Sequence, residues 1–348
     1  QAGSADAAYR LAVLSLVDAA EPLNWHRLAE RLTRACHAGH PDALCDAALF
    51  FGRFGTPAQQ RASTALLEHA AVRGSIVAMA LLGERLAAGR LCDADPARAN
   101  GIRVLAAQLD LPVPPPDARH GVAAPEPRQA PPPVGELDFT RLPDAAQPPE
   151  ADTLDARIGL RLAAQALSDE ECLYIRCLGG PHLQPSITAD PNGETQRSRI
   201  RTSHDFLFLP ETETVALRLL QARMAAAAGL PLKQAEAMVL LRYAPGQEYL
   251  PHRDYLPPSR FTPVADGGSG QRLRTAIAYL NTPDDGGDTV FPLLERALPA
   301  RIGHLALFDN LHPDGRLNET SLHAGAPVKQ GVKWICTLWI RQQAHRTA

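Results

Sequence analysis

The 348-residue sequence lacks the marks of several large protein classes. No apolar run approaches the roughly 18 residues that a membrane-spanning helix needs, and residues 1–10, QAGSADAAYR, lack the basic start and apolar stretch of a signal peptide. The six cysteines form no C-x-x-C pair, which indicates free buried thiols in a reducing compartment. A net charge of −3 offers no basic surface for a polyanion. We therefore expect a cytoplasmic protein with neither a membrane nor a nucleic-acid partner.

Proline is abundant, but it is unevenly distributed. Residues 111–150 hold 12 of the 31 prolines, and a segment so rich in proline can neither continue a helix nor lie inside a sheet. With 45% hydrophobic residues, the remainder of the chain is sufficient for two domains with cores of their own. We predict a multidomain chain, with a helical domain at 1–110, an extended proline-rich linker at 111–154 and a second domain at 155–348.

The first of these segments is predicted to be all-α. It is rich in Ala, Leu and Arg, with apolar residues at helical spacing. ACHAGHPDAL at 35–44 returns as AAVRGSIVAM at 70–79, which aligns Gly39 with Gly74, and Gly55 recurs as Gly89. A period of about 35 residues is typical of stacked helical hairpins, and the segment resembles Sel-like repeats of the tetratricopeptide superfamily. Two interpretations stay open: the repeats bind a protein partner, or they only cap the second domain.

The second domain has the pattern of an α+β fold. LSDEECLYI begins with Ser168 and has Glu171 three residues later, a capping box that predicts a helix start. Apolar, β-rich stretches separated by turns follow: MVLLRYAP, LRTAIAYLN, DTVFPLL, HLALFDNL and VKWICTLWI. Short strands in such succession predict an antiparallel sandwich or barrel.

The triplet His252-Arg253-Asp254 has two incompatible interpretations. As the HRD of a kinase catalytic loop it needs an Asn five residues after the Asp, where Ser259 stands, and neither a DFG nor a glycine-rich loop accompanies it. As the H-x-D of an iron site it needs two side chains on one face, which the alternation of a strand supplies. The triplet alone is weak evidence, because 40–42 and 312–314 are also H-x-D. The first of these lies in the helical segment, and the proline and glycine of HPDG indicate a turn for the second.

Later residues favour the iron site. His323 in SLHAGAPVKQGVKW is a candidate third ligand, and Lys333 follows ten residues later. In KWICTLWI, alternation places residues 333, 335, 337 and 339 on one face of a strand and residues 334, 336, 338 and 340 on the other. A lysine at the start of an apolar strand can hold the far carboxylate of a dicarboxylate that chelates the iron at its other end.

With these segments, residues 155–342 resemble the prolyl 4-hydroxylase type of Fe(II) and 2-oxoglutarate-dependent dioxygenase. SRIRTSHDFLF is similar to the family's R-T-S segment, YAPGQEYLPHRD to its Y-x-x-G-x-x-Y-x-x-H-x-D, and YLNTPDDGGDTVFP to its Y-L-N followed by G-G-x-T-x-F-P. SLHAGAPVKQGVKW is similar to its closing H-x-G-x-P-V-x-x-G-x-K-W. The resemblance implies a double-stranded β-helix, or jelly-roll, core.

Position by position, the resemblance implies the site. His252, Asp254 and His323 would ligate Fe(II), and Lys333 would pair with the 5-carboxylate of 2-oxoglutarate. The resemblance also implies that Tyr243, Tyr279 and Trp339 line the cosubstrate pocket. It places Arg201 and Ser203 at the mouth of a peptide groove. For these last two a solvated loop is the competing interpretation. Thr289 and Phe291 are expected to be packing residues.

The resemblance also implies the reaction. O2 and 2-oxoglutarate would be consumed, succinate and carbon dioxide released, and a carbon of the substrate hydroxylated; ascorbate stays open as a further cofactor. The favoured substrate is a prolyl or other side chain of a peptide or protein that the repeats recruit. The alternatives are a small molecule or free amino acid, and a repeat scaffold with an inactive oxygenase domain. Residues 255–273, rich in proline and glycine, are expected to shape the substrate entrance.

Overall fold

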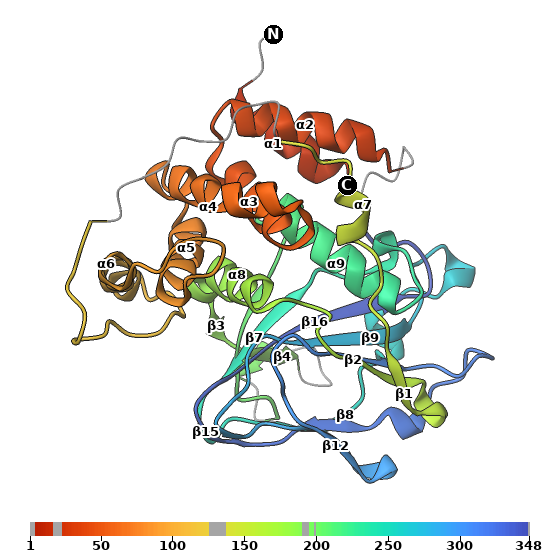
Figure 1. Ribbon diagram of the computed structural model, residues 1–348. Coiled ribbons are helices and arrows are strands. Elements are labelled where there is room, and N and C mark those ends of the chain that lie inside the picture. The colour runs from red at the N-terminus through yellow and green to blue at the C-terminus, as the bar shows by residue number, and fades with distance from the viewer. Residues whose placement is uncertain (1–3, 17–22, 125–136, 190–194, 198–199, 347–348) are drawn as a thin grey trace.

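The computed structural model describes residues 4–16, 23–124, 137–189, 195–197 and 200–346. Helices occupy the first two of these ranges: α1 (Ala5–Leu14), α2 (Trp25–His37), α3 (Pro41–Phe54), α4 (Pro57–Val72), α5 (Ile76–Ala88) and α6 (Pro96–Gln108). They are followed by the one-turn helix α7 (Leu142–Ala145). Two further helices, α8 (Asp169–Gly179) and α9 (Val215–Ala227), lie among the strands. The first part is therefore helical and the second α+β, as predicted. Figure 1 shows the helices of the first part stacked on one side of the sheets of the second.

Helices α2 to α6 of the helical part each begin with a side-chain cap. Thr56 and Gln59 form a capping box at α4, and the side chain of Ser75 accepts the hydrogen bond of a main-chain N–H of α5. The aligned glycines lie in equivalent turns, Gly39 before α3 and Gly74 before α5, and both have positive φ values, of 74° and 97°. Only glycine adopts this conformation without strain, which explains why the sequence echo contains it. The class of repeat remains a prediction.

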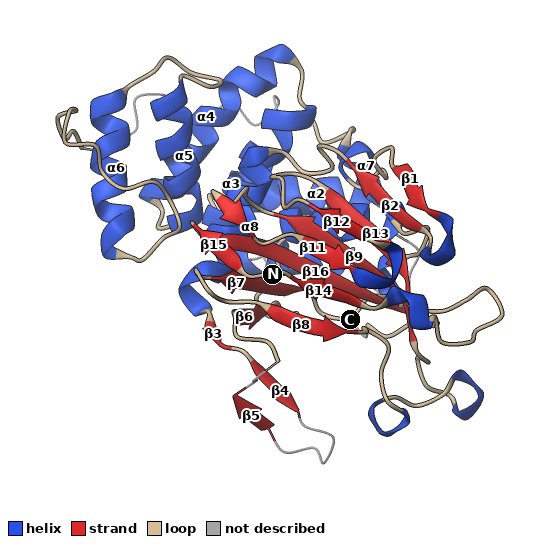
Figure 2. Ribbon diagram, turned by 90° about the horizontal axis from the view of Figure 1, so that it is seen from below, coloured by secondary structure: helices blue, strands red, loops and turns tan. Residues whose placement is uncertain are grey.

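Two antiparallel sheets lie one over the other in the second part. The larger has the order β1 (Asp152–Asp155), β2 (Leu160–Ala163), β13 (Leu305–Asp309), β9 (Arg272–Tyr279), β16 (Lys333–Arg341), β7 (Val239–Tyr243), β6 (His204–Leu207) and β3 (Gln184–Pro185). The smaller has the order β12 (Arg296–Leu298), β11 (Thr289–Phe291), β14 (His323–Gly325) and β8 (Tyr249–His252). Seen from below in Figure 2, the smaller sheet lies across the larger. Two strand pairs complete the described sheets: β10 (Asp285–Gly286) with β15 (Val328–Gln330), and β4 (Ile187–Ala189) with β5 (Thr195–Arg197).

The central strand β16 has the two faces that its sequence predicts. Ile335 and Trp339 pack in the inner core between the sheets, together with Phe291 and Phe308. Trp334, Cys336, Leu338 and Ile340 belong instead to the core shared with the helices. The inner face therefore lines the space between the sheets, and the outer face carries the helical layer.

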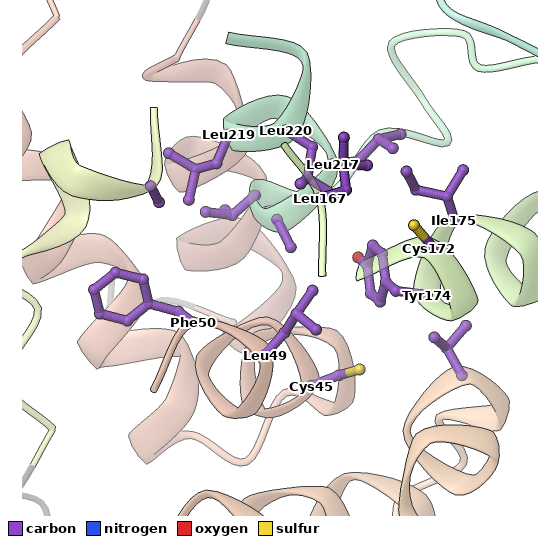
Figure 3. Packing of buried hydrophobic residues seen from close by; sticks show 14 of the residues in the cluster. Cys45, Leu49, Phe50, Leu167, Cys172, Tyr174, Ile175, Leu217, Leu219 and Leu220 are labelled. Atoms are coloured by element: carbon purple, nitrogen blue, oxygen red, sulfur yellow. The ribbon is translucent and has the colours of Figure 1, made fainter. Parts of the chain in front are cut away.

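The helical part and the larger sheet are joined through α8 and α9, and we call this contact the seam. The capping box at Ser168 and Glu171 starts α8 as predicted. Figure 3 shows apolar side chains from α3, α8 and α9 meeting in the seam, among them Leu49, Ile175 and Leu217. Because the seam lies on the outer face of the larger sheet, the helices α1 to α6 are on the opposite side of that sheet from the smaller sheet, whose strands β8 and β12 are labelled in Figure 1.

Ion pairs cross the seam inside this apolar packing. Glu170 of α8 accepts two hydrogen bonds from Arg85 of α5, at 2.6 Å from Nε and 3.0 Å from Nη2, and both side chains are buried. Glu171 accepts from Arg223 of α9 at 2.9 Å and from Arg53 of α3. The side chain that caps α8 therefore also links three helices, a role that the sequence did not show.

The cysteines, the helix lengths and the proline-rich stretch can also be compared with the sequence-based predictions. All six cysteines are free, and five are buried while Cys92 is half-buried. None of the described helices is long and apolar enough to cross a membrane. Within the proline-rich stretch the described residues include α7 and most of β1, so the sheet begins at Asp152, shortly before the predicted start of the second domain. The domain limits remain predictions.

Candidate metal centre

Three predicted ligands meet at one end of the smaller sheet. One ligand atom each from His252, Asp254 and His323 can be chosen so that all three lie within 4.8 Å of one another. Nε2 of His252 is 3.6 Å from Oδ1 of Asp254, and Nε2 of His323 is 3.7 Å from Oδ2. The two histidines are paired residues of β8 and β14, so the register of this ladder brings them together. Two imidazoles and one carboxylate are the donor set of a facial iron site, with positions left open for other ligands.

The structure corrects one detail of the local geometry. We expected His252 and Asp254 on one continuous strand, but β8 ends at His252, and Asp254 lies in the bend that follows. Two residues of β9 account for the bend. Arg272 donates from Nη1 to the main-chain oxygen of Asp254 at 3.2 Å, and Thr275 donates to its Oδ2 at 2.8 Å. These contacts turn the chain from the smaller sheet toward the larger one and bring the carboxylate to the imidazoles.

Both imidazoles are held in the tautomer that a metal needs. Nδ1 of His252 lies 2.9 Å from the main-chain oxygen of Leu250, and Nδ1 of His323 lies 3.0 Å from that of Ser321. A carbonyl oxygen only accepts, so each Nδ1 must carry the hydrogen, which leaves the lone pair on Nε2. Tyr249 stacks on the ring of His252 with 3.4 Å between ring centroids and restricts its rotation further.

The charges of the ligands also suit metal binding. Burial alone raises the pKa of the Asp254 carboxyl, but the imidazoles of His323 and His252 and the guanidinium of Arg272 outweigh it, and the pKa lies well below its ordinary value. Burial, aided by His252, lowers the pKa of His323 to about 4. At neutral pH the carboxylate is therefore ionised and this imidazole neutral, as metal ligation requires.

Lys333 lies at the start of β16 on the inner face, 2% exposed. In the described part of the chain its ammonium makes neither an ion pair nor a hydrogen bond; it lies 5.6 Å from the ring centre of Tyr243 and 5.9 Å from that of Tyr279. Burial lowers its pKa from 10.5 to about 8, against a weaker opposing effect of Asp288. A buried cation of this kind is costly unless a ligand supplies the anion.

The other predicted pocket residues surround this lysine or the triad. Tyr243 is paired with Lys333 across the ladder of β7 and β16, and burial raises the pKa of its phenol. Tyr279 donates its hydroxyl hydrogen to Thr289 at 2.8 Å. Trp339 is farther along β16, beneath the guanidinium of Arg272 at 3.8 Å, and its indole Nε1 is buried with no acceptor in the described residues.

Arg201 lies beside Tyr249, the residue that stacks on His252, and Ser203 lies beside Tyr243. Arg201 forms a β-bridge with Tyr249, pairs with Asp205, and places its guanidinium 5.7 Å from the ring centre of Tyr249. Ser203 is 2% exposed, and its hydroxyl is 2.8 Å from that of Ser186. The solvated-loop alternative therefore does not hold for Ser203. Of the two expected packing residues, Phe291 lies in the inner core, while Thr289 accepts the hydrogen bond of Tyr279.

The competing H-x-D triplets lie far from such an arrangement. His40 caps α3 and stacks on Tyr9, and His312 begins the predicted turn, in which the N–H of Gly315 donates to its oxygen. Among the described residues, the group of His252, Asp254 and His323 is the only one that could hold a metal ion.

Three residues that support the triad escaped the sequence analysis: Arg272, Thr275 and Asn310. Asn310 donates from Nδ2 to the hydroxyl oxygen of Thr275 at 2.9 Å. A signal was present in the sequence. Thr275 is a polar residue within the apolar strand LRTAIAYLN, and Asn310 directly follows the end of β13. Nothing in the sequence, however, places those two strands beside Asp254.

Known proteins match this part of the chain. Residues 238–341 match the family described as the 2OG-Fe(II) oxygenase superfamily. Probable prolyl 4-hydroxylase 10 of Arabidopsis thaliana is 32% identical over 200 residues, which are 52% of this chain and 68% of that protein. The chain belongs to the 2OG-Fe(II) oxygenase superfamily. Its H-x-D…H iron-binding triad is formed by His252, Asp254 and His323.

Other proteins that are similar to this oxygenase are also named as prolyl hydroxylases. Probable prolyl 4-hydroxylase 7 of Arabidopsis thaliana is 33% identical over 201 residues, 52% of this chain and 62% of that protein, so the chain spans less than two thirds of that relative's length. Among solved structures, the viral collagen prolyl hydroxylase of Paramecium Bursaria Chlorella virus-1 in its 2OG complex is 28% identical. The similarity covers 52% of this chain and 95% of that one, with a TM-score of 0.41. The residues matched by the family, 238–341, include the triad and Lys333 and none of the helices α1 to α6.

Proposed function

We propose that this oxygenase is an Fe(II)- and 2-oxoglutarate-dependent hydroxylase of prolyl or other side chains in a peptide or protein. The observation that carries the proposal is the combination of an open three-ligand site with a buried, unpaired cation, Lys333, on the same inner face. One substrate C–H, O2 and 2-oxoglutarate would give one C–OH, succinate and carbon dioxide, a balance in which the cosubstrate supplies two electrons.

The chain's own residues would prepare this reaction. His252, Asp254 and His323 would hold Fe(II), which when bound supplies the redox chemistry that activates O2. Lys333 would hold the 5-carboxylate of 2-oxoglutarate, and the hydroxyl of Tyr243, beside it in the ladder, would line the same pocket. Tyr279 and the indole Nε1 of Trp339 line the inner face around them. The packed walls exclude water, which strengthens each charge interaction and protects the oxidant from side reactions.

The substrate would enter at the edge strand β8. Arg201 and Tyr249 bridge there, and the N–H of Leu250 donates to the oxygen of Ile200, so the mouth has a main-chain ladder with Arg201 beside it. We favour a peptidyl proline because the relatives are named prolyl 4-hydroxylases. A free amino acid or other small molecule is the second candidate for the same core.

The rest of the chain fits this proposal. We propose that the two facing sheets are a double-stranded β-helix and that 1–110 and 155–348 are separate domains joined by 111–154. Helices α1 to α6 would be Sel-like repeats. Their packing through the seam favours the cap interpretation for α3 and α5, and recruitment of a protein partner would use the remaining helix surfaces. We place the protein in the cytoplasm.

An inactive oxygenase domain with a scaffold role is the competing function. It offers no reason for a buried, unpaired lysine beside a complete triad, because an unpaired buried charge lowers stability unless a ligand uses it.

Turnover tests the proposal directly. Iron-loaded protein, 2-oxoglutarate and a peptide mixture from a cell extract should give succinate, with peptides heavier by one oxygen atom detected by mass spectrometry. His252→Ala and Asp254→Ala should remove both products while the circular dichroism spectrum stays that of the parent. Succinate formation by His252→Ala at the parent's rate would contradict the assignment.

A further inference from the structure

A chain of buried polar side chains lies behind the carboxylate of Asp254. Thr275 is hydrogen-bonded to its Oδ2 at 2.8 Å, and Asn310 is hydrogen-bonded to Thr275 at 2.9 Å. Thr275 and Asn310 are fully buried, and Asp254 is 5% exposed. Thr275 stands on the inner face of β9, opposite Phe308 on one side and Trp339 on the other. Placing a hydroxyl and an amide in this apolar core is unfavourable unless they are hydrogen-bonded.

The direction of these hydrogen bonds follows from chemistry alone. An ionised carboxylate only accepts, so the single hydroxyl hydrogen of Thr275 must go to Asp254. The oxygen of Thr275 is then left to accept, and the NH2 group of Asn310 is the donor that reaches it. The three groups therefore form a series in which Asn310 orients Thr275, and Thr275 orients the carboxylate.

The far end of the series is anchored in the main chain. The N–H of Asn310 donates to the oxygen of Leu273 at 2.9 Å, and its oxygen accepts from the N–H of Asn318 at 2.9 Å. Asn310 is therefore held between β9 and the segment that leads to His323. The other amide atom of Asn310, Oδ1, is buried with no donor in the described residues. An unpaired buried oxygen lowers the stability of the folded state. The side chain of Asn310 offsets this cost with the hydrogen bond that it donates to Thr275.

We propose that Thr275 and Asn310 are positioning residues of the metal centre, which act in series on Asp254. The terminal torsion of an aspartate side chain has a broad, shallow preference, so nothing intrinsic keeps its carboxylate plane in one orientation. The hydrogen bond from Thr275 selects the orientation in which the carboxylate meets both imidazoles. Arg272 fixes only the main chain of Asp254, because its remaining guanidinium nitrogens are engaged by Glu236 at 2.8 and 2.7 Å. The inference rests on the proposed iron site.

The affinity of the metal-free protein for Mn(II), measured by calorimetric titration without 2-oxoglutarate, tests the proposal. Thr275→Val keeps the shape of the side chain but removes the hydroxyl, and it should raise the dissociation constant about tenfold to a hundredfold, the usual effect of losing a residue that orients a metal ligand. Thr275→Ser keeps the hydroxyl and should stay close to the parent. Thr337→Val is the matched control, a buried threonine on the inner face of the neighbouring strand β16, and it should leave the affinity unchanged.

The series arrangement makes a second prediction. Asn310→Leu should weaken Mn(II) binding less than Thr275→Val, because the hydroxyl remains but is no longer oriented. In the variant that combines both changes, the dissociation constant should equal that of Thr275→Val alone, since Asn310 acts only through Thr275. Effects that multiply in the double variant would show that the two residues act independently and would overturn the series.

Each failure has its own signature. If the parent protein binds no Mn(II), the proposed metal centre itself is wrong. If the parent and Thr275→Val bind Mn(II) equally well, the metal centre is supported and the positioning role is wrong. The same conclusion follows if Thr275→Val lowers the unfolding temperature of the metal-free protein but leaves the Mn(II) affinity unchanged. Should Thr275→Val fail to fold, Thr275→Ala compared with Thr275→Ser gives the same contrast without adding a methyl group.

Discussion

The seam and the metal centre both bury charged side chains, but they treat them differently. In the seam, Glu170 is matched by the guanidinium of Arg85, and Glu171 is shared between Arg223 and Arg53. At the metal centre, the ammonium of Lys333 is equally buried and, in the described residues, has no anion within ion-pair distance. Charges that are paired within the chain hold the two parts together, whereas in the proposed function the unpaired cation binds a ligand.

The comparison predicts opposite consequences when a charge is removed. Deleting one member of a satisfied buried pair leaves its partner charged and desolvated, so the folded state is destabilised. Deleting the unpaired charge relieves a desolvation cost in the folded state and damages only ligand binding.

Arg85→Ala should lower the free energy of unfolding by about 3–5 kcal/mol, because Glu170 is left buried without its bidentate partner. Denaturant unfolding followed by circular dichroism measures the change. Arg53→Ala should cost less, since Glu171 keeps Arg223. Arg316→Ala is the control: its pair with Asp314 is exposed, so its loss should change stability by about 0.5 kcal/mol or less. Equal effects at Arg85 and Arg316 would show that the seam pair adds nothing.

Lys333→Ala should raise the apparent KM for 2-oxoglutarate roughly thirtyfold or more, since losing a desolvated charge partner costs about 2–5 kcal/mol. Mn(II) affinity should change little. Lys333→Arg should recover part of the loss, because it keeps the charge but brings a bulkier planar group.

Removing the charge of Lys333 should affect stability in the opposite direction from removing the charge of Arg85. Lys333→Met removes the unpaired charge at similar length, so the ligand-free protein should unfold at an equal or higher denaturant concentration than the parent. A loss of stability as large as that of Arg85→Ala would mean that Lys333 has a structural partner. It would contradict the proposed difference between the seam and the metal centre.

The pH dependence of the cosubstrate KM should follow Lys333. Burial lowers its pKa to about 8 in the ligand-free protein, and in the proposed function the protonated form binds the dicarboxylate. The apparent KM should therefore be constant below pH 8 and rise about tenfold per pH unit above it, as one proton is taken up with the ligand. Lys333→Arg should abolish this rise, because a guanidinium stays protonated. A constant KM between pH 7 and 9.5 in the parent would contradict the role.

His312→Ala should have the smallest effect, leaving 2-oxoglutarate turnover unchanged, because His312 lies in a surface turn outside the metal group. Loss of turnover in a folded His312→Ala protein would mean that the wrong H-x-D had been chosen. Turnover by this variant therefore shows which of the H-x-D triplets, 252–254 or 312–314, the reaction requires.

Much of the site was predictable because local pattern and motif spacing carry it. The two faces of β16 follow from strand alternation, so the inward position of Lys333 could be inferred without coordinates. The capping box at Ser168 could be predicted for the same reason, since all its atoms belong to one helical turn. The end of β8 at His252 was not predictable, because β9, some twenty residues later, pulls Asp254 out of the strand.

The sequence by itself determined the helical and α+β parts, the H-x-D…H triad and the face on which Lys333 lies. These depend on residue type and on spacing along one element, which the chain carries locally. Only the tertiary structure decided that Glu171 also binds Arg53 and Arg223, and that Asn310 reaches Asp254 through Thr275. Those contacts join residues between 21 and 118 positions apart, and the sequence pattern of neither partner specifies which distant strand or helix will be packed against it.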